Sequence, residues 1–250
     1  MAALVGAVGP YRLRPEPCAS PFRHLAQAIA SQQISGRAAD TILARFVALY
    51  DGGDAAGPAE ARDPAGDRAR DDRFPEPAQV LATDPERLRS VGFSAAKAAA
   101  LRDLAARTLE GVVPDTPTLE RLDDAAIVAR LTQVRGIGPW TVQMMLMFQL
   151  GRPDVLPVDD YGVRNGFRLA YGLAELPTPR ELARHGERWA PWRSAAAWYL
   201  WRAVDLARAG APMPVAVGPR RGSVRTRPVN PRARAASSSA PRRRPGARTR

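Results

Sequence analysis

The chain has 250 residues, which is enough for one large domain or two lobes with a buried core. Its formal net charge is +12, but residues 211–250 hold eleven arginines and no acidic residue, so the preceding part is nearly neutral. Cys18 is the only cysteine, which excludes an intramolecular disulfide, a zinc site built from cysteines and a four-cysteine iron–sulfur cluster.

The first part of the chain is predicted to form an arm, a pair of helices and an insertion. Residues 1–20 are rich in proline, alanine and glycine, which favours an N-terminal arm. Apolar side chains at helical spacing predict two helices between Phe22 and Tyr50, with an interruption near Ile34. Residues 51–75 hold almost no large aliphatic side chain and are predicted to be a flexible insertion.

A second pair of helices is predicted within residues 78–110. Ser94 is a suitable N-cap for the second helix of this pair. Residues 115–121 are predicted to be a proline-rich connection. Asp123 or Asp124 can then cap the next helix, because a short carboxylate side chain accepts from the first free N–H groups of a helix.

A tight, glycine-rich turn follows between a helix that ends near Val134 and a helix that runs from Pro139 to about Gln149. Gly136 and Gly138 allow a positive φ and a close backbone approach, and proline suits a first helical position. The first N–H groups of the second helix have no partner within it, so they form a ready phosphate site. This hairpin predicts an interaction with nucleic acid.

A loop after the hairpin delivers two adjacent carboxylates, Asp159 and Asp160, to the start of a helix predicted over residues 161–171. Two more helices are predicted over residues 179–189 and 191–209. No alternation of apolar and polar residues with a period of two occurs, so strands are not expected.

The predicted fold class is therefore all-α, with two helical lobes around a cleft, a helix-hairpin-helix motif and a disordered basic C-terminal tail. The tail is residues 211–250, which combine arginine, proline and serine without apolar periodicity. Such a tail favours salt-sensitive, sequence-independent attraction to DNA, although a purely solubilising tail explains the composition equally well.

The chain has no predicted membrane segment and no predicted metal site. No run approaches the about 18 apolar residues that a membrane helix needs. The apolar start MAALVGAV is short and has no basic region before it, so a signal peptide is not expected. The two histidines, His24 and His185, are isolated from each other. We expect a soluble, cytoplasmic protein.

Four ordered segments resemble the helix-hairpin-helix (HhH-GPD) DNA glycosylases. They are FRHLAQAIASQQIS at 22–35, VRGIGPWT at 134–141, LPVDDYGVRNG at 156–166 and WAPWRSAAAWYLW at 189–201. The last is similar to the 3-methyladenine DNA glycosylase II branch, in a compact form without the N-terminal β domain. The resemblance assigns residues 21–210 to this domain.

The resemblance implies that Asp160 is the catalytic residue, since it matches the aspartate that closes the family's loop. A carboxylate beside the sugar would stabilise an oxocarbenium-like transition state and orient the attacking water. The alternative is that the two aspartates only cap the next helix. Of the two, Asp159 is the more suitable cap.

The resemblance also implies an aromatic base pocket. An alkylated purine carries a positive charge, which an electron-rich ring recognises through a cation–π contact of about 1–2 kcal/mol. Trp192, Trp198 and Trp201 also have near-helical spacing and could all be core; we expect Trp189 and Trp192 to be structural. The predicted pocket residues are Trp140, Met144, Tyr161 and Trp201.

Contacts to the DNA backbone and groove are implied at two places. Gln33 would be the wedge that fills the gap left by a flipped nucleotide, with Gln32 beside it in the minor groove. The hairpin amides would anchor a phosphate, and a structural alkali ion is possible there. Arg164 is a weaker candidate for backbone contact. The predicted DNA-binding residues are Gln32, Gln33, Gly136, Gly138 and Thr141.

The resemblance implies a monofunctional glycosylase that releases alkylated bases, of the 3-methyladenine and 7-methylguanine class, and so begins base-excision repair. Its partner would be double-stranded DNA, and it would act as a monomer without a redox cofactor or catalytic metal. Bifunctional relatives carry a lysine where Trp140 stands, and the only lysine, Lys97, lies on another helix. A glycosylase/AP lyase and a non-catalytic hairpin DNA-binding protein are the alternatives.

Overall fold

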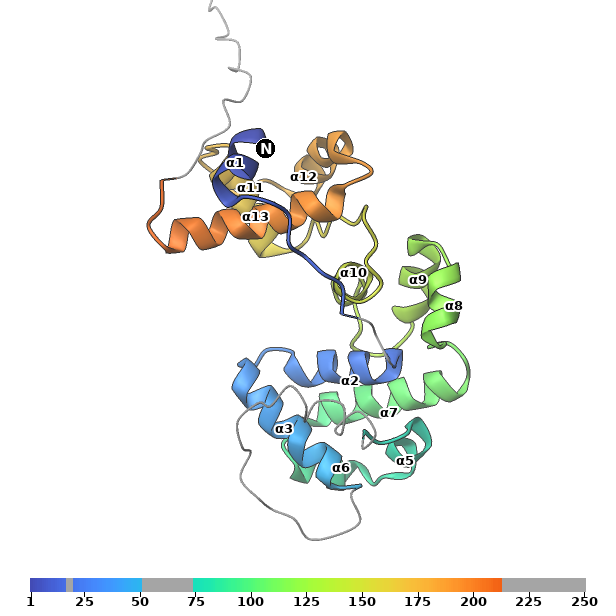
Figure 1. Cartoon of the computed structure of the whole chain (residues 1–250). Helices are drawn as coiled ribbons and strands as arrows, with labels where there is room; N and C mark the ends of the chain where they lie inside the picture. The colour runs from blue at the N-terminus through green and yellow to red at the C-terminus, as the bar shows by residue number, and fades with distance from the viewer. Residues whose placement is uncertain (17–19, 51–73, 213–250) are drawn as a thin grey trace, which may run out of the picture. The chain divides into compact units, whose positions relative to one another are not determined.

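The computed structural model describes residues 1–16, 20–50 and 74–212, and this part of the chain is helical without a strand, as predicted (Figure 1). The chain divides into two units, Met1–Ala216 and Val217–Arg250. All but the first two residues of the predicted basic tail, and nearly all of the predicted insertion, lie outside the described residues. The helices are α1 (Ala2–Val8), α2 (Pro21–Ser31), α3 (Gly36–Ala48), α5 (Pro77–Ala82), α6 (Pro85–Ser90), α7 (Ala95–Leu109), α8 (Thr116–Arg121), α9 (Asp124–Leu131), α10 (Pro139–Phe148), α11 (Tyr161–Ala170), α12 (Pro179–Gly186), the 3₁₀ helix η1 (Glu187–Trp189) and α13 (Arg193–Arg208).

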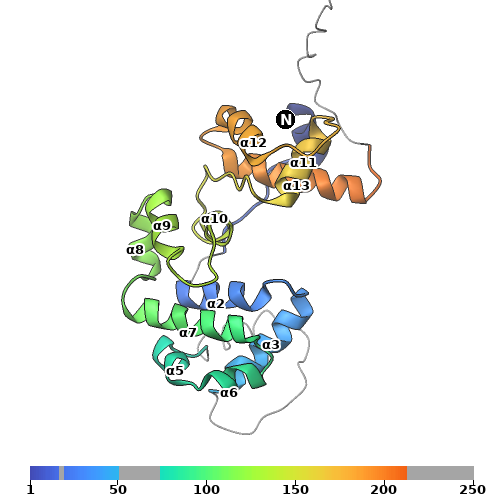
Figure 2. The ribbon, with the colours of Figure 1, turned by 180° about the vertical axis from the view of Figure 1, so that it is seen from behind.

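One group of helices consists of α2, α3, α5, α6 and α7, and α2 and α7 lie side by side in both views (Figures 1 and 2). Phe46 of α3 is fully buried in its centre and makes edge-to-face contacts with Phe74 and Phe93. Such aromatic pairs add about 0.5–1.5 kcal/mol beyond the burial of their area. Ser94 caps α7 by accepting from the Lys97 N–H, so that prediction is confirmed.

A second group is built on the crossing of α11 and α13, with α1 packed on α13. Gly166 makes this crossing possible, because a Cβ built there would lie 1.9 Å from the carbonyl oxygen of Leu200. The two backbones therefore approach more closely than any side chain would permit. Leu4 of α1 is fully buried, so the predicted N-terminal arm contributes a helix to the core that the sequence did not indicate.

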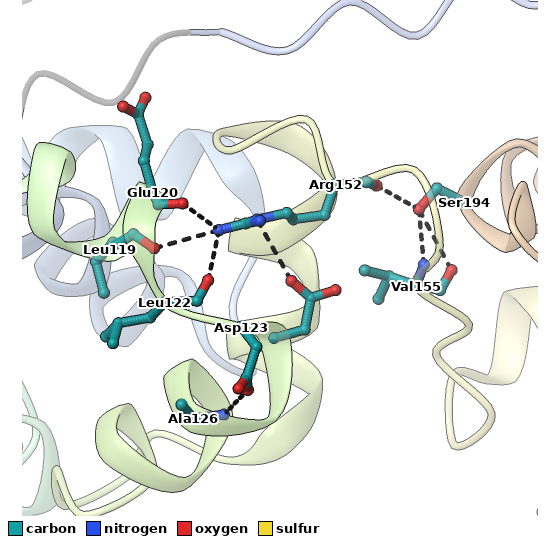
Figure 3. A network of polar contacts seen from close by, with 9 residues as sticks. Leu119, Glu120, Leu122, Asp123, Ala126, Arg152, Val155 and Ser194 are labelled. Carbon is teal, nitrogen blue, oxygen red and sulfur yellow. Dashed lines mark hydrogen bonds and ion pairs between the residues drawn. The ribbon is translucent and has the colours of Figure 1, made fainter.

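The loop that leads to the adjacent aspartates is held by Arg152, whose Nη2 donates to the carbonyls of Leu119, Glu120 and Leu122 at the end of α8 (Figure 3). Its Nε lies 3.3 Å from a carboxylate oxygen of Asp124. Ser194 of α13 joins the same network, since its hydroxyl donates to the Arg152 carbonyl and accepts from the Val155 N–H. These contacts fix the loop to α8, α9 and α13.

The structure corrects one element and divides two others. Residues 115–121, predicted to be a connection, form α8, because Asp115 accepts from the Thr118 N–H and a proline occupies the first turn without losing a hydrogen bond. The predicted helix before Ser90 is two short helices divided by the Asp84 cap. The helix predicted at 179–189 ends as η1. None of the described helices is long and apolar enough to cross a membrane.

Candidate active site and nucleic-acid interface

The hairpin between α9 and α10 has the predicted tight turn, but only one of its two glycines has a positive φ. Gly136 has a φ of +78°, whereas Gly138 has a φ of −98° and an extended backbone, so only Gly136 adopts the positive φ that both glycines allow. A Cβ on Gly138 would meet no atom within 4 Å. Another molecule can therefore approach the Gly138 backbone closely. Ile137 is buried and donates its N–H to the Val134 carbonyl, which anchors the turn to the core.

Both predicted pocket tryptophans donate to the same carboxylate. The indole Nε1 of Trp140, on α10, lies 2.9 Å from Oδ2 of Asp160, and the Nε1 of Trp201, on α13, lies 2.9 Å from Oδ1. The N–H of Val163 also donates to Oδ1, at 2.7 Å. All three partners are donors, and they match an ionised carboxylate, which can only accept. Three helices thus hold one anionic group in a fixed orientation.

The assignment of the cap to Asp159 is wrong. Asp160 is the N-cap of α11, because its own carboxylate accepts from the Val163 N–H. The Asp160 N–H closes a turn to the Pro157 carbonyl, which leaves Asp159 inside that turn with an exposed side chain. Asp160 therefore both caps α11 and accepts the two indole hydrogen bonds, so the two interpretations do not exclude each other.

The Trp201 indole is oriented by two features that the sequence did not single out. Phe148 stacks on it, with ring centroids 5.8 Å apart and an interplanar angle of 28°. Gly162 lies beneath its edge, and a Cβ there would lie 2.9 Å from Cδ1 and 3.0 Å from Nε1. A side chain at this position would push the indole away from Asp160. The glycine two residues after the aspartate was the signal that could have indicated this contact.

The surroundings of the carboxylate are open. Trp140 is 47 % exposed and Tyr161 is 68 % exposed, while Met144 is partly buried against the core. Asp160 does not line either of two cavities of about 400 and 310 Å³ in the described residues. The site therefore presents aromatic faces outward beside the carboxylate and does not enclose it.

The remaining tryptophans divide between the core and the surface. Trp189 packs edge-to-face on Phe167 and His185, which agrees with a structural role. Trp198 contacts the Tyr11 ring at 5.3 Å. Trp192 is 65 % exposed, so it is not a core residue.

The polar corner after α2 contacts the hairpin directly. The side-chain amide of Gln32 donates to the Gly136 carbonyl, with 2.8 Å between Nε2 and O. Gln33 is exposed and has a φ of +58°, and it is the one non-glycine residue with a positive φ in the described part of the chain. The two predicted DNA-contacting elements are thus brought side by side by a bond between residues 104 positions apart.

The side chains of Thr141 and Arg164, the two weaker candidates for DNA contact, are engaged within the protein. Thr141 is 8 % exposed, so any contact it makes with a phosphate would come from its backbone N–H, which lies in the first turn of α10. Arg164 donates through Nε to the Pro177 carbonyl at 2.8 Å and holds the segment before α12.

Comparison with known proteins identifies the family of the chain. Residues 26–191 match the family model described as HhH-GPD superfamily base excision DNA repair protein. The chain is 39 % identical over 205 residues to DNA-3-methyladenine glycosylase 1 of Schizosaccharomyces pombe, and the match covers 82 % of each chain.

Two solved structures are similar over most of the described residues. One is the S. pombe 3-methyladenine DNA glycosylase in complex with abasic DNA, with a TM-score of 0.66, 38 % identity and coverage of 82 % of this chain and 91 % of the other. The second is a DNA-3-methyladenine glycosidase from Bacillus halodurans, with a TM-score of 0.68, 30 % identity and coverage of 84 % and 87 %. With its hairpin, its helix-capping carboxylate and this match over most of its helices, the chain belongs to the HhH-GPD superfamily of base excision DNA repair proteins.

Proposed function

We propose that the protein is a monofunctional DNA glycosylase, which hydrolyses the N-glycosidic bond of alkylated bases flipped out of duplex DNA. The observation that carries the proposal is the convergence of two indole N–H groups, from α10 and α13, on the carboxylate that caps α11. A hairpin that only binds DNA needs neither this carboxylate nor the exposed aromatic faces beside it. The names of the similar glycosylases support the same class of lesion.

The chemistry follows from a fixed anion beside a cationic leaving group. In a base such as 3-methyladenine or 7-methylguanine, the electrons of the breaking bond neutralise the positive charge of the ring, so the base leaves without an added proton. Positive charge then develops on the sugar, where the Asp160 carboxylate stabilises it. The same carboxylate orients the water that adds to the sugar and accepts its proton. The exposed Trp140 ring binds the cationic base through its face.

The corner and the hairpin hold the DNA in this proposal. The N–H groups at the start of α10 and the open side of Gly138 receive a backbone phosphate. Gln33 enters the duplex as the wedge and partly replaces the stacking of the flipped nucleotide. The protein acts as a monomer without a catalytic metal. An alkali ion at the hairpin would have to use carbonyls other than that of Gly136, or share it with Gln32.

Lyase chemistry is disfavoured by the position of the only lysine. A Schiff base needs a free amine next to the sugar. The Lys97 ammonium group donates to the carbonyls of Ala30 and Gln32, at 2.7 Å each, and Trp140 occupies the place of the family's nucleophilic lysine.

Incubation with a duplex treated with dimethyl sulfate tests the function. We expect release of free methylated purines, detected by chromatography, and an abasic strand that stays intact until it is heated in alkali. Treatment with borohydride should trap no covalent protein–DNA adduct. A trapped adduct with a cleaved strand would establish the glycosylase/lyase instead, and binding without any release would establish the non-catalytic DNA-binding protein.

Replacement of either Trp140 or Trp201 by phenylalanine separates hydrogen bonding from stacking. The ring remains but its donor to Asp160 is lost, and one hydrogen bond to a charged group corresponds to about tenfold in rate. We expect each variant to release methylated base about tenfold more slowly in single-turnover assays. Trp192→Phe is the matched control, because Trp192 is exposed and is not one of the three donors to the carboxylate. Unchanged rates in both site variants would mean that the indole N–H groups do not orient the catalytic anion.

A further inference from the structure

The only lysine of the chain closes the C-terminal end of α2. Lys97, in the first turn of α7, extends its Nζ between the carbonyls of Ala30 and Gln32 and lies 2.7 Å from each oxygen. The last carbonyls of a helix have no partner within it, and a cation there also opposes the negative end of the helix dipole. One side chain thus satisfies two carbonyls at the point where α2 turns into the Gln32–Gln33 corner.

This contact is maintained at a cost. Burial lowers the pKa of Lys97, because the ammonium group is partly removed from water. The neighbouring side chains at the start of α7 are alanines, which carry no polar group to replace the ammonium group. A lysine side chain also loses more rotamer freedom than most when it is fixed. The two hydrogen bonds to the carbonyls and the favourable position at the end of the helix dipole offset these costs.

The same face of α7 also supports the hairpin. Asp103 accepts from the backbone N–H of Arg135, with 2.7 Å between Oδ2 and N. Ala100 lies under Gly136, where an added Cβ would be 3.4 Å from its own Cβ. Lys97, Ala100 and Asp103 follow one another at intervals of three residues and therefore line one face of the helix. This face, the α7 support, contacts both elements that hold the DNA.

Gln32 completes the connection, because Lys97 binds its backbone carbonyl and its own side chain binds the hairpin carbonyl of Gly136. Gln33 comes directly after it, with a φ of +58° that a glutamine rarely adopts. A strained residue keeps such a conformation only where its surroundings fix it. The residue before it is fixed at both its backbone and its side chain.

We propose that Lys97 is a positioning residue for DNA insertion: it holds the Gln33 wedge at a set distance from the hairpin that anchors the phosphate. The inference rests on the proposed function, since it gives Gln33 and the hairpin their roles in DNA binding. Lys97 acts through Gln32 and Gln33 and does not touch the base or the sugar. Loss of the Lys97 ammonium group leaves the Asp160 carboxylate and its two indole donors in place, but Gln33 is no longer held.

The test uses a duplex with a tetrahydrofuran abasic analogue next to 2-aminopurine, whose fluorescence rises when the neighbouring stack is opened. Wild type should bind this duplex more tightly than an undamaged one and raise the fluorescence. Lys97→Met should reduce the preference for the abasic duplex by about tenfold, the equivalent of one charge-assisted hydrogen bond, and suppress the fluorescence rise. Lys97→Arg, which keeps a cation with several donors, should restore most of both signals.

Arg130→Met is the matched control for stability. Arg130 also donates to two carbonyls next to a helix end, those of Gly111 at 2.6 Å and Val112 at 2.9 Å, but at the opposite end of α7. It should lower the melting temperature as Lys97→Met does and keep the wild-type preference for the abasic duplex. The double variant Lys97→Met/Gln33→Ala should lose no more preference for the abasic duplex than Gln33→Ala alone, because both changes disable the same wedge.

Three results would overturn the inference: a wild-type preference in Lys97→Met, an equal loss in Arg130→Met, or additive losses in the double variant. If wild type neither prefers the abasic duplex nor releases methylated base, the proposed function and this inference fail together. If wild type releases methylated base normally but Lys97→Met keeps the wild-type preference for the abasic duplex, the inference fails and the proposed function stands.

Discussion

Asp160→Asn is expected to slow the release of methylated bases by about 10²- to 10⁴-fold, the range of a positioned acid–base group. Asparagine caps helices as well as aspartate does, so its oxygen can keep the bond from the Val163 N–H and the helical fold should persist. The amide nitrogen, however, is a donor. It would face the indole N–H of Trp140 or Trp201, and the negative charge that stabilises the sugar cation would be gone.

Three measurements define this outcome: single-turnover base release, affinity for an abasic duplex and the melting temperature. Affinity should change little, because the backbone N–H groups of α10 and the Gln32–Gln33 corner, which hold the DNA in this proposal, are separate from the three donors to the Asp160 carboxylate. Asp159→Asn is the matched control, since it makes the same chemical change on the exposed neighbour and should release base at the wild-type rate. A near-normal rate in Asp160→Asn, together with a slow Asp159→Asn variant, would transfer the catalytic role to Asp159.

Gly166→Ala is expected to destabilise the fold by about 3 kcal/mol, at the upper end of the range for overpacking. The added Cβ would lie 1.9 Å from the carbonyl oxygen of Leu200, and a backbone atom of a buried helix cannot rotate away as a side chain can. The crossing of α11 and α13 would have to open. Urea denaturation should give a lower midpoint.

Gly6→Ala is the matched control for this change. Gly6 lies within α1, and a Cβ there would meet no atom within 4 Å. Alanine favours a helix over glycine by up to about 1 kcal/mol, so this variant should be as stable as wild type or slightly more stable. Equal stabilities for Gly166→Ala and wild type would mean that the two helices are not in close backbone contact.

The crossing of α11 and α13 also affects the site, because it sets the position of the Trp201 indole relative to Asp160. Trp201 follows Leu200 on α13, while Asp160 caps α11, so the separation of the two helices sets the distance between indole and carboxylate. A variant that opens the crossing should therefore lose activity even at temperatures where it remains folded. The two glycines of α11 both support this geometry: Gly162 leaves room for the Trp201 indole, and Gly166 leaves room for the Leu200 backbone.

Local patterns in the sequence determined most of the helices and several of their ends. Apolar spacing indicated α2 and α3, and cap, turn and stop residues indicated α7 and α10. Side chains such as Ser94 and Asp123 capped helices where they were expected to. These features depend on residues within one or two turns of each other, so a short stretch contains all the information they need. The same holds for the hairpin, whose turn residues are contiguous. Where local signals misled, as at α8, prolines that begin a helix were interpreted as breaking it.

Only the tertiary structure decided how the site is assembled. The two indole bonds to Asp160 join residues 20 and 41 positions apart, and the Gln32 bond to Gly136 joins residues 104 positions apart. No periodicity encodes such pairs, because they depend on how whole helices pack. The choice between Asp159 and Asp160 as the cap was likewise set by the turn closed at Pro157, which determines which carboxylate faces α11. The residue types were visible in the sequence, but their convergence on one carboxylate follows from helices brought together by burial of their apolar faces.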